Sequence, residues 1–539
     1  MSQQNESLRR VLMLAALSVF GSISLAHAQS LRPLPHAIRA PGQAHANVAT
    51  GARTSSPAWT PLANQPSFLV DGASNPILLT DGSVLVQDAG FPDWWRLTPD
   101  QNGSYVNGTW SQVASLPPYY SPLYHASAVL PDGRLIIEGG EYLLSLDQTQ
   151  LVPTWTAQGA IYDPRTNVWS PVAPPPFFAL FGADQTIGDA QSVVLANGTY
   201  MQADCCTPQA ALLDPVSLTW RPTGTGKFDI NDEEGWTLLP SGKVLTVDAY
   251  VFAYDPAGTG SEIYNPRAGA WTSAGNTPVQ LWDSAAACGG AAFASYEVGP
   301  AVLRPDGTVF YTGSNQCGAG HTAIYNTHRG TWAAGPDFPL GLNIADGPAA
   351  LEPNGKVLMM ASPGLFNSPS VFLEWNGRTI TPIAGPPNAA SDSSYYGNML
   401  VLPTGQILLT DFSNDIEIFT PARAEAESEY APSIASAPSR VSAGTTYQIF
   451  GFRFNGMSQG GAYGDDVQSA TNYPLVRLTN NATGHVSYGR THDHSSMAVA
   501  SEQLVSTQFE VNSATERGPS QLVVVANGIA SAPVPVLVQ

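Results

Sequence analysis

The sequence is poor in charge, and most of the charge that it has is negative. Charged residues make up 12% of the 539, and 22 Lys and Arg stand against 42 Asp and Glu, a formal net charge of -20. Such a chain repels phosphate backbones and anionic lipid, which argues against nucleic acid and membrane surfaces as partners. No stretch after Leu25 approaches the roughly 18 apolar residues of a membrane-spanning helix, so we expect no membrane insertion.

Cysteine is also scarce. There are four cysteines, with no CxxC motif and no Cys/His zinc pattern. An even number in an oxidising compartment suggests disulfides. Two pairings are open: the adjacent Cys205 and Cys206 could form a vicinal bridge, and Cys288 and Cys317 could close the predicted hairpin that they flank.

The N-terminus has the three parts of a secretory signal. Arg9 and Arg10 precede an apolar run from Val11 to Leu25, and Ala26-His27-Ala28 offers small residues for cleavage. We expect a signal peptide at residues 1–28, cut after Ala28, and a secreted or periplasmic protein. A retained anchor helix is the alternative. Residues 29–55, rich in Pro, Ala and Gly, predict a linker.

One unit recurs along most of the chain: an apolar run, a tight turn ending in Gly, and a second β-rich run. Asp-Gly or Asn-Gly between apolar runs strongly indicates a β-hairpin, because type I′ turns need positive φ. The seven turn glycines are Gly82, Gly133, Gly198, Gly242, Gly307, Gly355 and Gly405.

Most of these hairpins are followed by a second one that ends in Trp, as in IYDPRTNVW before Ser170 and IYNPRAGAW before Thr272. Four strands per unit and a period of about 50 residues are typical of kelch propeller blades. The sequence predicts an all-β fold with a seven-bladed kelch-type β-propeller at residues 56–422. Residues 57–65 are expected to supply the last strand of blade seven, which removes an unpaired sheet edge.

After about residue 423 the repeat ends. A polar linker is followed by alternating strands such as TYQIFGF and QLVVVA. Residues 430–539 therefore predict an immunoglobulin-like β-sandwich, without the Cys pair of antibody domains.

Ligand sites of propellers gather where the innermost strands begin, at one end of the central channel. Counting back eight residues from the residue before each turn glycine gives seven equivalent positions, five of them acidic or phenolic. Carboxylates sharing one channel end would raise one another's pKa or hold a cation; capping of strands is the structural alternative. The positions are Ala73, Tyr124, Asp189, Glu233, Val298, Asp346 and Tyr396.

A second candidate motif is RTHDHSSM at residues 490–497. His492 and His494 are two apart, so in a strand both face the same way. A polar surface loop is the alternative.

These features, with the stretches YHASAVLPDGRL, YYGNMLVLPTGQILL and YPLVRLTNNATGHVSYGRTHDHS, resemble the galactose oxidase and glyoxal oxidase family over residues 57–539. In that family a hairpin of the C-terminal domain enters the channel and delivers a His to copper. The resemblance implies Tyr124 as the equatorial redox tyrosine, Tyr395 as the axial tyrosine and base, and His492 as the delivered ligand. His494 could face the channel in its place.

The sequence departs from the family at three positions. Asn75 stands where the family has the Cys that is crosslinked to the redox tyrosine, and Tyr396 replaces a ligand His. Tyr142 stands where a shielding Trp would be expected. A site with few imidazoles and three phenols suits a harder ion than copper, so we expect copper to bind weakly, or another metal ion or none.

Three functions remain open at this stage. The first is a divergent secreted oxidoreductase acting on primary alcohols, aldehydes or carbohydrates. The second is a hydrolase or lyase that uses Asp189, Glu233 or Asp346 with His492. The third is a monomeric, non-catalytic propeller that binds carbohydrate or protein and keeps a relic metal site.

Overall fold

The computed structural model describes residues 58–145, 150–178, 180–181, 184–251, 258–283, 295–422 and 429–539. The expected signal peptide and linker lie outside these residues. Within them helix is limited to short 3-10 turns, namely η2 (Pro339–Gly341), η3 (Pro387–Ala390) and η4 (Ser394–Tyr396). No helix in the described ranges is long and apolar enough to cross a membrane.

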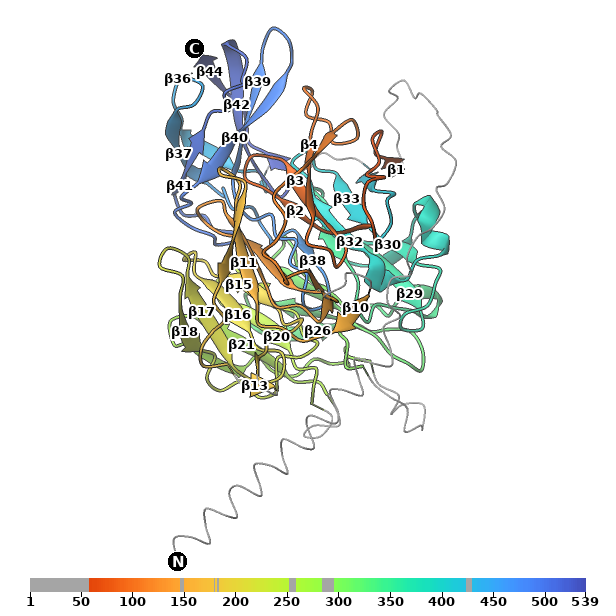
Figure 1. Cartoon of the computed structure of the whole chain (residues 1–539). Coiled ribbons are helices and arrows are strands. Elements are labelled where there is room, and N and C mark those ends of the chain that lie inside the picture. The colour runs from red at the N-terminus through yellow and green to blue at the C-terminus, as the bar shows by residue number, and fades with distance from the viewer. Residues whose placement is uncertain are drawn as a thin grey trace, which may run out of the picture.

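Seven antiparallel units of four strands follow one another along residues 58–422 (Figure 1). The first strands are β2 (Ala73–Leu78), β7 (Ala126–Val129), β15 (Ser192–Val194), β19 (Thr237–Leu238), β23 (Ala301–Leu303), β28 (Ala349–Leu351) and β32 (Asn398–Val401). The second strands are β3 (Val84–Asp88), β8 (Leu135–Glu138), β16 (Tyr200–Ala203), β20 (Val244–Val247), β24 (Thr308–Thr312), β29 (Val357–Pro363) and β33 (Ile407–Thr410).

The third and fourth strands complete each unit. The third strands are β4 (Trp94–Thr98), β11 (Gly159–Asp163), β17 (Ala210–Asp214), β21 (Ser261–Asn265), β25 (Thr322–Asn326), β30 (Val371–Trp375) and β34 (Glu417–Thr420). The fourth strands are β5 (Thr109–Gln112), β12 (Val168–Val172), β18 (Thr219–Thr223), β22 (Ala270–Ser273), β26 (Thr331–Ala334), β31 (Ile380–Pro382) and β1 (Ala58–Pro61). Short additional strands are β6 (Pro122–Leu123), β9 (Tyr142–Leu144), β10 (Leu151–Pro153), β13 (Leu180–Phe181), β14 (Asp184–Gln185) and β27 (Leu342–Asn343).

The turn between the first and second strand depends on glycine in every unit. All seven turn glycines have φ between 75° and 85°. Side chains larger than hydrogen rarely adopt this left-handed region, so the recurring Gly sets the hairpin.

The N-terminal strand closes the series. β1 pairs with β34, with Trp59 opposite Phe419, and the Trp59 indole donates to the Ala384 carbonyl at 2.8 Å. Indole groups make the same link between consecutive units elsewhere, since Trp169 donates to Ala114 and Trp220 to Ala173. The recurring Trp therefore ties several outer strands to the preceding unit.

A separate arrangement of strands follows, which we call the C-terminal sheet. β40 pairs with β39 through its first residues and with β41 through Arg490–His492, so the sheet bends into two layers around one apolar core. Its strands are β35 (Ser433–Ser436), β36 (Arg440–Val441), β37 (Thr446–Phe452), β39 (Leu475–Asn480), β40 (Val486–His492), β41 (Val505–Glu510), β42 (Gly518–Ala526), β43 (Ile529–Ala530) and β44 (Val534–Val538).

One segment leaves the C-terminal sheet and runs between the first strands of the propeller. We call residues 458–473 the channel loop. Its strand β38 (Gly461–Ala462) pairs with β28, with Ala462 opposite Ala349, and lies apart from the other blue strands in Figure 1. Gln459 accepts from the Leu238 amide in β19, and the Gln468 carbonyl accepts from Ser127 in β7. Contacts with strands on opposite sides place this loop in the central channel.

Candidate functional site at the channel mouth

The two ends of the channel are covered differently. The C-terminal sheet covers the end with the turn glycines: the amides of Thr491, His494 and Met497 donate to the carbonyls of Thr80, Pro131 and Ala196 at 3.0–3.1 Å. The first strands begin at the opposite end. We call that end the channel mouth.

Four tyrosines predicted as site residues lie at this mouth. The Tyr124 ring, almost fully buried, packs edge-on against Tyr142, with ring centroids 6.0 Å apart. Phe412 lies 6.1 Å from Tyr124 and 5.8 Å from Tyr396, and Tyr396 lies 4.4 Å from Tyr395. Phe412, which the sequence reasoning missed, therefore connects the two pairs of phenols.

Asn75 lies beside this aromatic group. Its side chain is buried in β2, donates to Ser127 Oγ at 3.4 Å, and lines the same small cavity as Tyr124. An amide at this position provides no sulfur, so a thioether with the Tyr124 ring cannot form.

The expectation that the segment at 490–497 carries His492 into the channel is corrected by the structure. His492 is the last residue of β40 and pairs with Gln508 in β41, which holds it in the C-terminal sheet. His494 is buried there, bonded to Thr507 Oγ1 at 2.8 Å and stacked on Tyr473. Both histidines therefore lie at the turn-glycine end, away from Tyr124, Tyr395 and Tyr396. Burial lowers the pKa of His494 to about 3.

The channel loop reaches the mouth instead. The Tyr463 hydroxyl donates to the Tyr395 carbonyl at 2.7 Å. Gly464 lies so close to Asp346 and to the Val298 carbonyl that it has no room for a Cβ atom. Asp465 and Asp466 follow at the tip. The run GGAYGDD at residues 460–466 could have indicated this loop from the sequence, because two acids follow small residues that allow close backbone approach.

At this tip the buried Asp465 carboxylate interacts electrostatically with four other carboxylates. Asp189 and Asp346 were predicted; Asp465, Asp466 and Glu297 were not, and Glu297 directly precedes the counted position Val298. Each of the five is at most 3% exposed. Burial raises the pKa of Asp465 well above its usual range, and the charges of Asp466, Asp346, Asp189 and Glu297 raise it further.

Glu233 lies in a different part of the mouth. Glu233 and its neighbour Asp232 are half-buried, and both act electrostatically on Tyr250. Burial is the main cause that raises the pKa of the Tyr250 phenol, and the negative charges of Asp232 and Glu233 add to it.

Beside these acids three rings form what we call the aromatic rim: Tyr250, Trp282 and Tyr296. The centroids of Tyr250 and Tyr296 are 4.2 Å apart, and Trp282 stacks on Tyr296 at 5.2 Å. Both tyrosines are partly exposed. Tyr296 and Glu233 have φ of 68° and 60°, a strained conformation that is found preferentially at functional sites.

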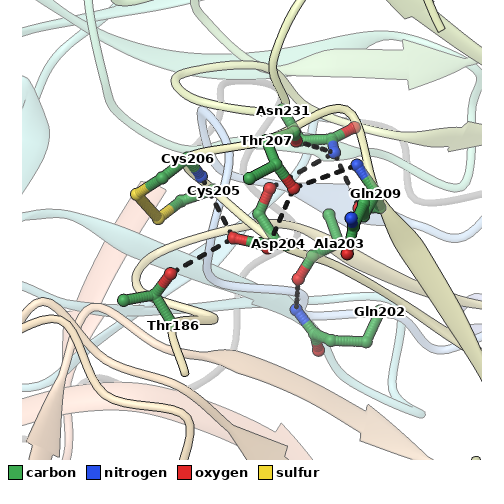
Figure 2. Close-up of a disulfide and its surroundings, with 9 residues drawn as sticks. All are labelled: Thr186, Gln202, Ala203, Asp204, Cys205, Cys206, Thr207, Gln209 and Asn231. Atoms are coloured by element: carbon green, nitrogen blue, oxygen red, sulfur yellow. Dashed lines mark hydrogen bonds between the residues drawn. A yellow bond between two sulfur atoms is a disulfide. The ribbon is translucent and has the colours of Figure 1, made fainter. Parts of the chain in front are cut away.

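A vicinal disulfide borders the acidic part of the mouth. The structure joins Cys205 to Cys206, and Asp204 accepts from the Cys206 amide and from Thr186 Oγ1 (Figure 2). Cys205 Sγ and one carboxylate oxygen each of Asp189 and Asp232 lie within 4.8 Å of one another. Cys317 is also disulfide-bonded; Cys288, the partner suggested by the sequence, lies outside the described residues.

Another acidic group nearby binds a cationic side chain. Asp229, Glu234 and Asp248 lie close together, but the buried Lys227 ammonium pairs with Asp229 and, at 2.9 Å, with Glu234. It also pairs with Glu262 at 2.9 Å. This group is an ion-pair network around one buried ammonium.

The donors at the mouth do not fit copper. Among the described residues they are phenol and carboxylate oxygens, whereas copper prefers sites that include imidazole nitrogens. His125 follows Tyr124, but its ring is buried against Gln87 Oε1, at 2.9 Å, and the Ala126 carbonyl, at 3.2 Å. Burial lowers the pKa of His125 to about 4. The residues at the mouth therefore support no step through copper.

The fold and the repeated four-stranded units define a β-propeller of the kelch type. A family profile described as "Kelch motif" matches residues 122–176, which contain Tyr124 and Tyr142. The chain is also similar to Kelch-like protein terF of Aspergillus terreus, with 28% identity over 146 residues. That match covers 26% of this chain, and the chain spans only 27% of the relative's length.

Two solved structures are similar in fold. A fungal alcohol oxidase of the AA5 family, in complex with copper, aligns at 12% identity over 89% of this chain and 98% of its own, with a TM-score of 0.48. A streptogramin B lyase aligns at 10% identity over 69% of this chain and 99% of its own, with a TM-score of 0.44. Similarities at this level assign neither a reaction nor a substrate to the chain.

Proposed function

We propose that the protein is an exported, non-redox propeller that binds a hydroxyl-rich ligand of the carbohydrate class at the channel mouth. The observation that carries this proposal is the partly exposed pair Tyr250 and Tyr296 beside the partly exposed acids Asp232 and Glu233. Aromatic faces pack against the apolar faces of sugar rings, and carboxylates accept hydrogen bonds from sugar hydroxyls. A few polar groups next to aromatic walls are typical of small-molecule sites.

The oxidoreductase alternative finds less support at the same mouth. Tyr124, Tyr142 and Tyr395 lie there, as such an enzyme would require. However, His492 and His494 lie at the other end of the channel, and Asn75 cannot crosslink to Tyr124. The hydrolase or lyase alternative has less support for the same reason, because it combined the mouth acids with His492.

The proposal includes the arrangement predicted from the sequence. A signal peptide at residues 1–28 would export the chain, and residues 29–55 would link it to the propeller at 56–422. Residues 430–539, with their two layers of strands, would form an immunoglobulin-like sandwich that anchors the channel loop. The protein would act as a monomer.

Binding to a glycan array, followed by calorimetry with each oligosaccharide that binds, tests the proposal. Tyr250→Ala should weaken binding at least about tenfold, the effect of losing some 1.4 kcal/mol of stacking, and Glu233→Gln should weaken it as well. Tyr119→Ala is the matched control, since Tyr119 is 78% exposed and outside the rim. Absence of any glycan binding, together with peroxide production by copper-treated protein on alcohols or aldehydes, would favour the oxidase instead.

A further inference from the structure

The vicinal disulfide lies beside two carboxylates that come from different units of the propeller. Cys205 Sγ and one oxygen each of Asp189 and Asp232 all lie within 4.8 Å of one another. Asp189 precedes β15 and Asp232 precedes β19, so three separate segments supply these atoms. Ligand atoms around one tetrahedral zinc ion lie about 3.5 Å apart, since its bonds to oxygen and sulfur are roughly 2.0–2.3 Å long. Small shifts of the two carboxylates would therefore bring all three atoms onto one ion.

Packing fixes the sulfur of Cys205 beside Asp189 independently of the disulfide bond. Cys205 is fully buried in an apolar cluster, and its amide donates to the Ile187 carbonyl at 3.2 Å. Gly188 directly precedes Asp189, and a Cβ atom added to it would lie only 2.8 Å from Cys205 Sγ. We therefore expect this sulfur to keep its position when the disulfide opens.

Hydrogen bonds hold the cysteine loop to the segment that carries Asp232. The Asp204 carboxylate accepts from Thr207 Oγ1 at 2.9 Å (Figure 2). The Asn231 side-chain amide donates to the carbonyls of Asp204 and Thr207 at 3.3 and 2.7 Å. Asn231 directly precedes Asp232, so these bonds fix the distance between Asp232 and the loop. None of them involves a sulfur atom, and opening of the disulfide leaves them in place.

The disulfide is also of a kind that can be reduced. Its two Cα atoms belong to adjacent residues and are 3.8 Å apart, below the usual lower limit of about 4.4 Å for disulfides. Cys206 is partly exposed, so a reductant can reach it from the mouth. Strained and accessible disulfides are the ones that open most easily.

We propose that Cys205, Asp189 and Asp232 form a zinc site that the vicinal disulfide keeps closed. A thiol reductant supplies two electrons and two protons, the S–S bond breaks to give two thiols, and the reductant leaves as its own disulfide. Zinc then binds the sulfur of Cys205, whose proton passes to solvent, and the Cys206 thiol can take the fourth position. Zinc accepts thiolate and carboxylate ligands together, whereas calcium and magnesium take oxygen ligands alone. This inference does not depend on carbohydrate binding.

Two variants separate the ligand from the disulfide. Cys206→Ser cannot form the disulfide and keeps Cys205 as a thiol, so it should bind one zinc ion per chain without any reductant. Cys205→Ser loses the same disulfide and also the ligand, so its zinc affinity should be at least about tenfold lower. Calorimetry measures both affinities, and an absorption band from thiolate to added cobalt(II) reports binding through sulfur. Because both variants lack the same crosslink, its loss cannot explain a difference between them.

The unchanged chain provides the second part of the test. With its disulfide closed it should bind no zinc at concentrations that saturate Cys206→Ser, and after reduction with a phosphine it should bind one ion. Asp189→Asn added to Cys206→Ser should weaken binding at least about tenfold, whereas Asp493→Asn, at an exposed carboxylate, should not change it.

Three results would overturn the proposal. They are absence of zinc binding by Cys206→Ser or by the reduced unchanged chain, equal zinc affinities of Cys205→Ser and Cys206→Ser, and equal binding by the unchanged chain with its disulfide closed. Glycan binding by the unchanged, oxidised chain without added zinc is measured separately, which keeps this outcome distinct from that of the proposed function.

Discussion

The Tyr463 hydroxyl donates a 2.7 Å hydrogen bond to the backbone carbonyl of Tyr395. Tyr463 belongs to the channel loop, and Tyr395 belongs to η4 at the mouth of the propeller. Both side chains are buried. The loop that grows from the C-terminal sheet therefore supports the mouth from inside the channel, so changes in the loop should alter both stability and the mouth.

Tyr463→Phe tests this contact directly. The variant removes the hydroxyl and leaves the buried carbonyl of Tyr395 without this donor, so the free energy of unfolding should fall by about 1–2 kcal/mol. Chemical denaturation of the full chain measures the change. Tyr119→Phe, at an exposed tyrosine, is the control and should have no effect. Equal stability of Tyr463→Phe and the unchanged protein would mean that the contact contributes nothing.

Glu417 should make the protein less stable as the pH rises. Burial, with the charges of Asp415, Asp411 and Asp392, raises the pKa of Glu417 to about 9. The carboxyl is then protonated in the folded state and ionised in the unfolded state between about pH 4.5 and 9. The unfolded state binds fewer protons there, so stability falls across this window by at most about 1.4 kcal/mol per pH unit from this group.

Glu417→Gln should remove that slope and stabilise the protein at pH 8. Denaturation curves at pH 5, 6.5 and 8 would show the difference growing with pH. Glu502→Gln, at an exposed partner of Arg453, provides the comparison. A constant difference across the three pH values would show that Glu417 does not titrate in this way.

His494 should make the protein less stable as the pH falls. Burial, together with the electrostatic effect of the neighbouring His492, lowers its pKa to about 3. The unfolded state takes up a proton near pH 6.5 while the folded state does not, so stability is lost as the pH falls from about 6.5 towards 3. His494→Gln should flatten this part of the profile. Ligand binding at the mouth should stay unchanged, because His494 packs on Tyr473 at the other end of the channel. Weaker binding in this variant would contradict the position of His494 at that end.

The order of the strands could be predicted from the sequence because each hairpin has its own local signal. The turn glycines, such as Gly133 with φ of 83°, and the interlocking Trp residues, such as Trp169, act over a few neighbouring residues. Tyr124 and Asp346 could be placed at the mouth by counting, since the distance along an inner strand follows from its turn.

The segment that enters the channel could not be predicted from the sequence in the same way. Residues 458–473 and residues 490–497 both follow strand-like runs, and only contacts made across the whole fold decide which of the two enters. His492 is retained in the C-terminal sheet because its strand pairs with β41 at Gln508. Asp465 enters because Gly461 and Gly464 allow the loop to approach β28 and Asp346. Small residues next to paired acids indicate a close approach of the backbone to other residues. The sequence does not show which residues these are, because they lie far away along the chain.

Gly464→Ala should separate the loop from the mouth. Gly464 is buried, and an added methyl group would overlap the Asp346 carboxylate and come within 3.0 Å of the Val298 carbonyl. Either the buried Asp346 carboxylate or the loop must then shift, at an expected loss of about 1–3 kcal/mol in the free energy of unfolding. Gly318→Ala is the matched control, because its nearest neighbour would be 3.8 Å away. Hydrogen exchange should report faster exchange in residues 458–473 of Gly464→Ala alone. If both variants have the same free energy of unfolding as the unchanged chain, Gly464 is not packed against Asp346 at the axis. The position of Asp465 beside Asp346 would then also be wrong.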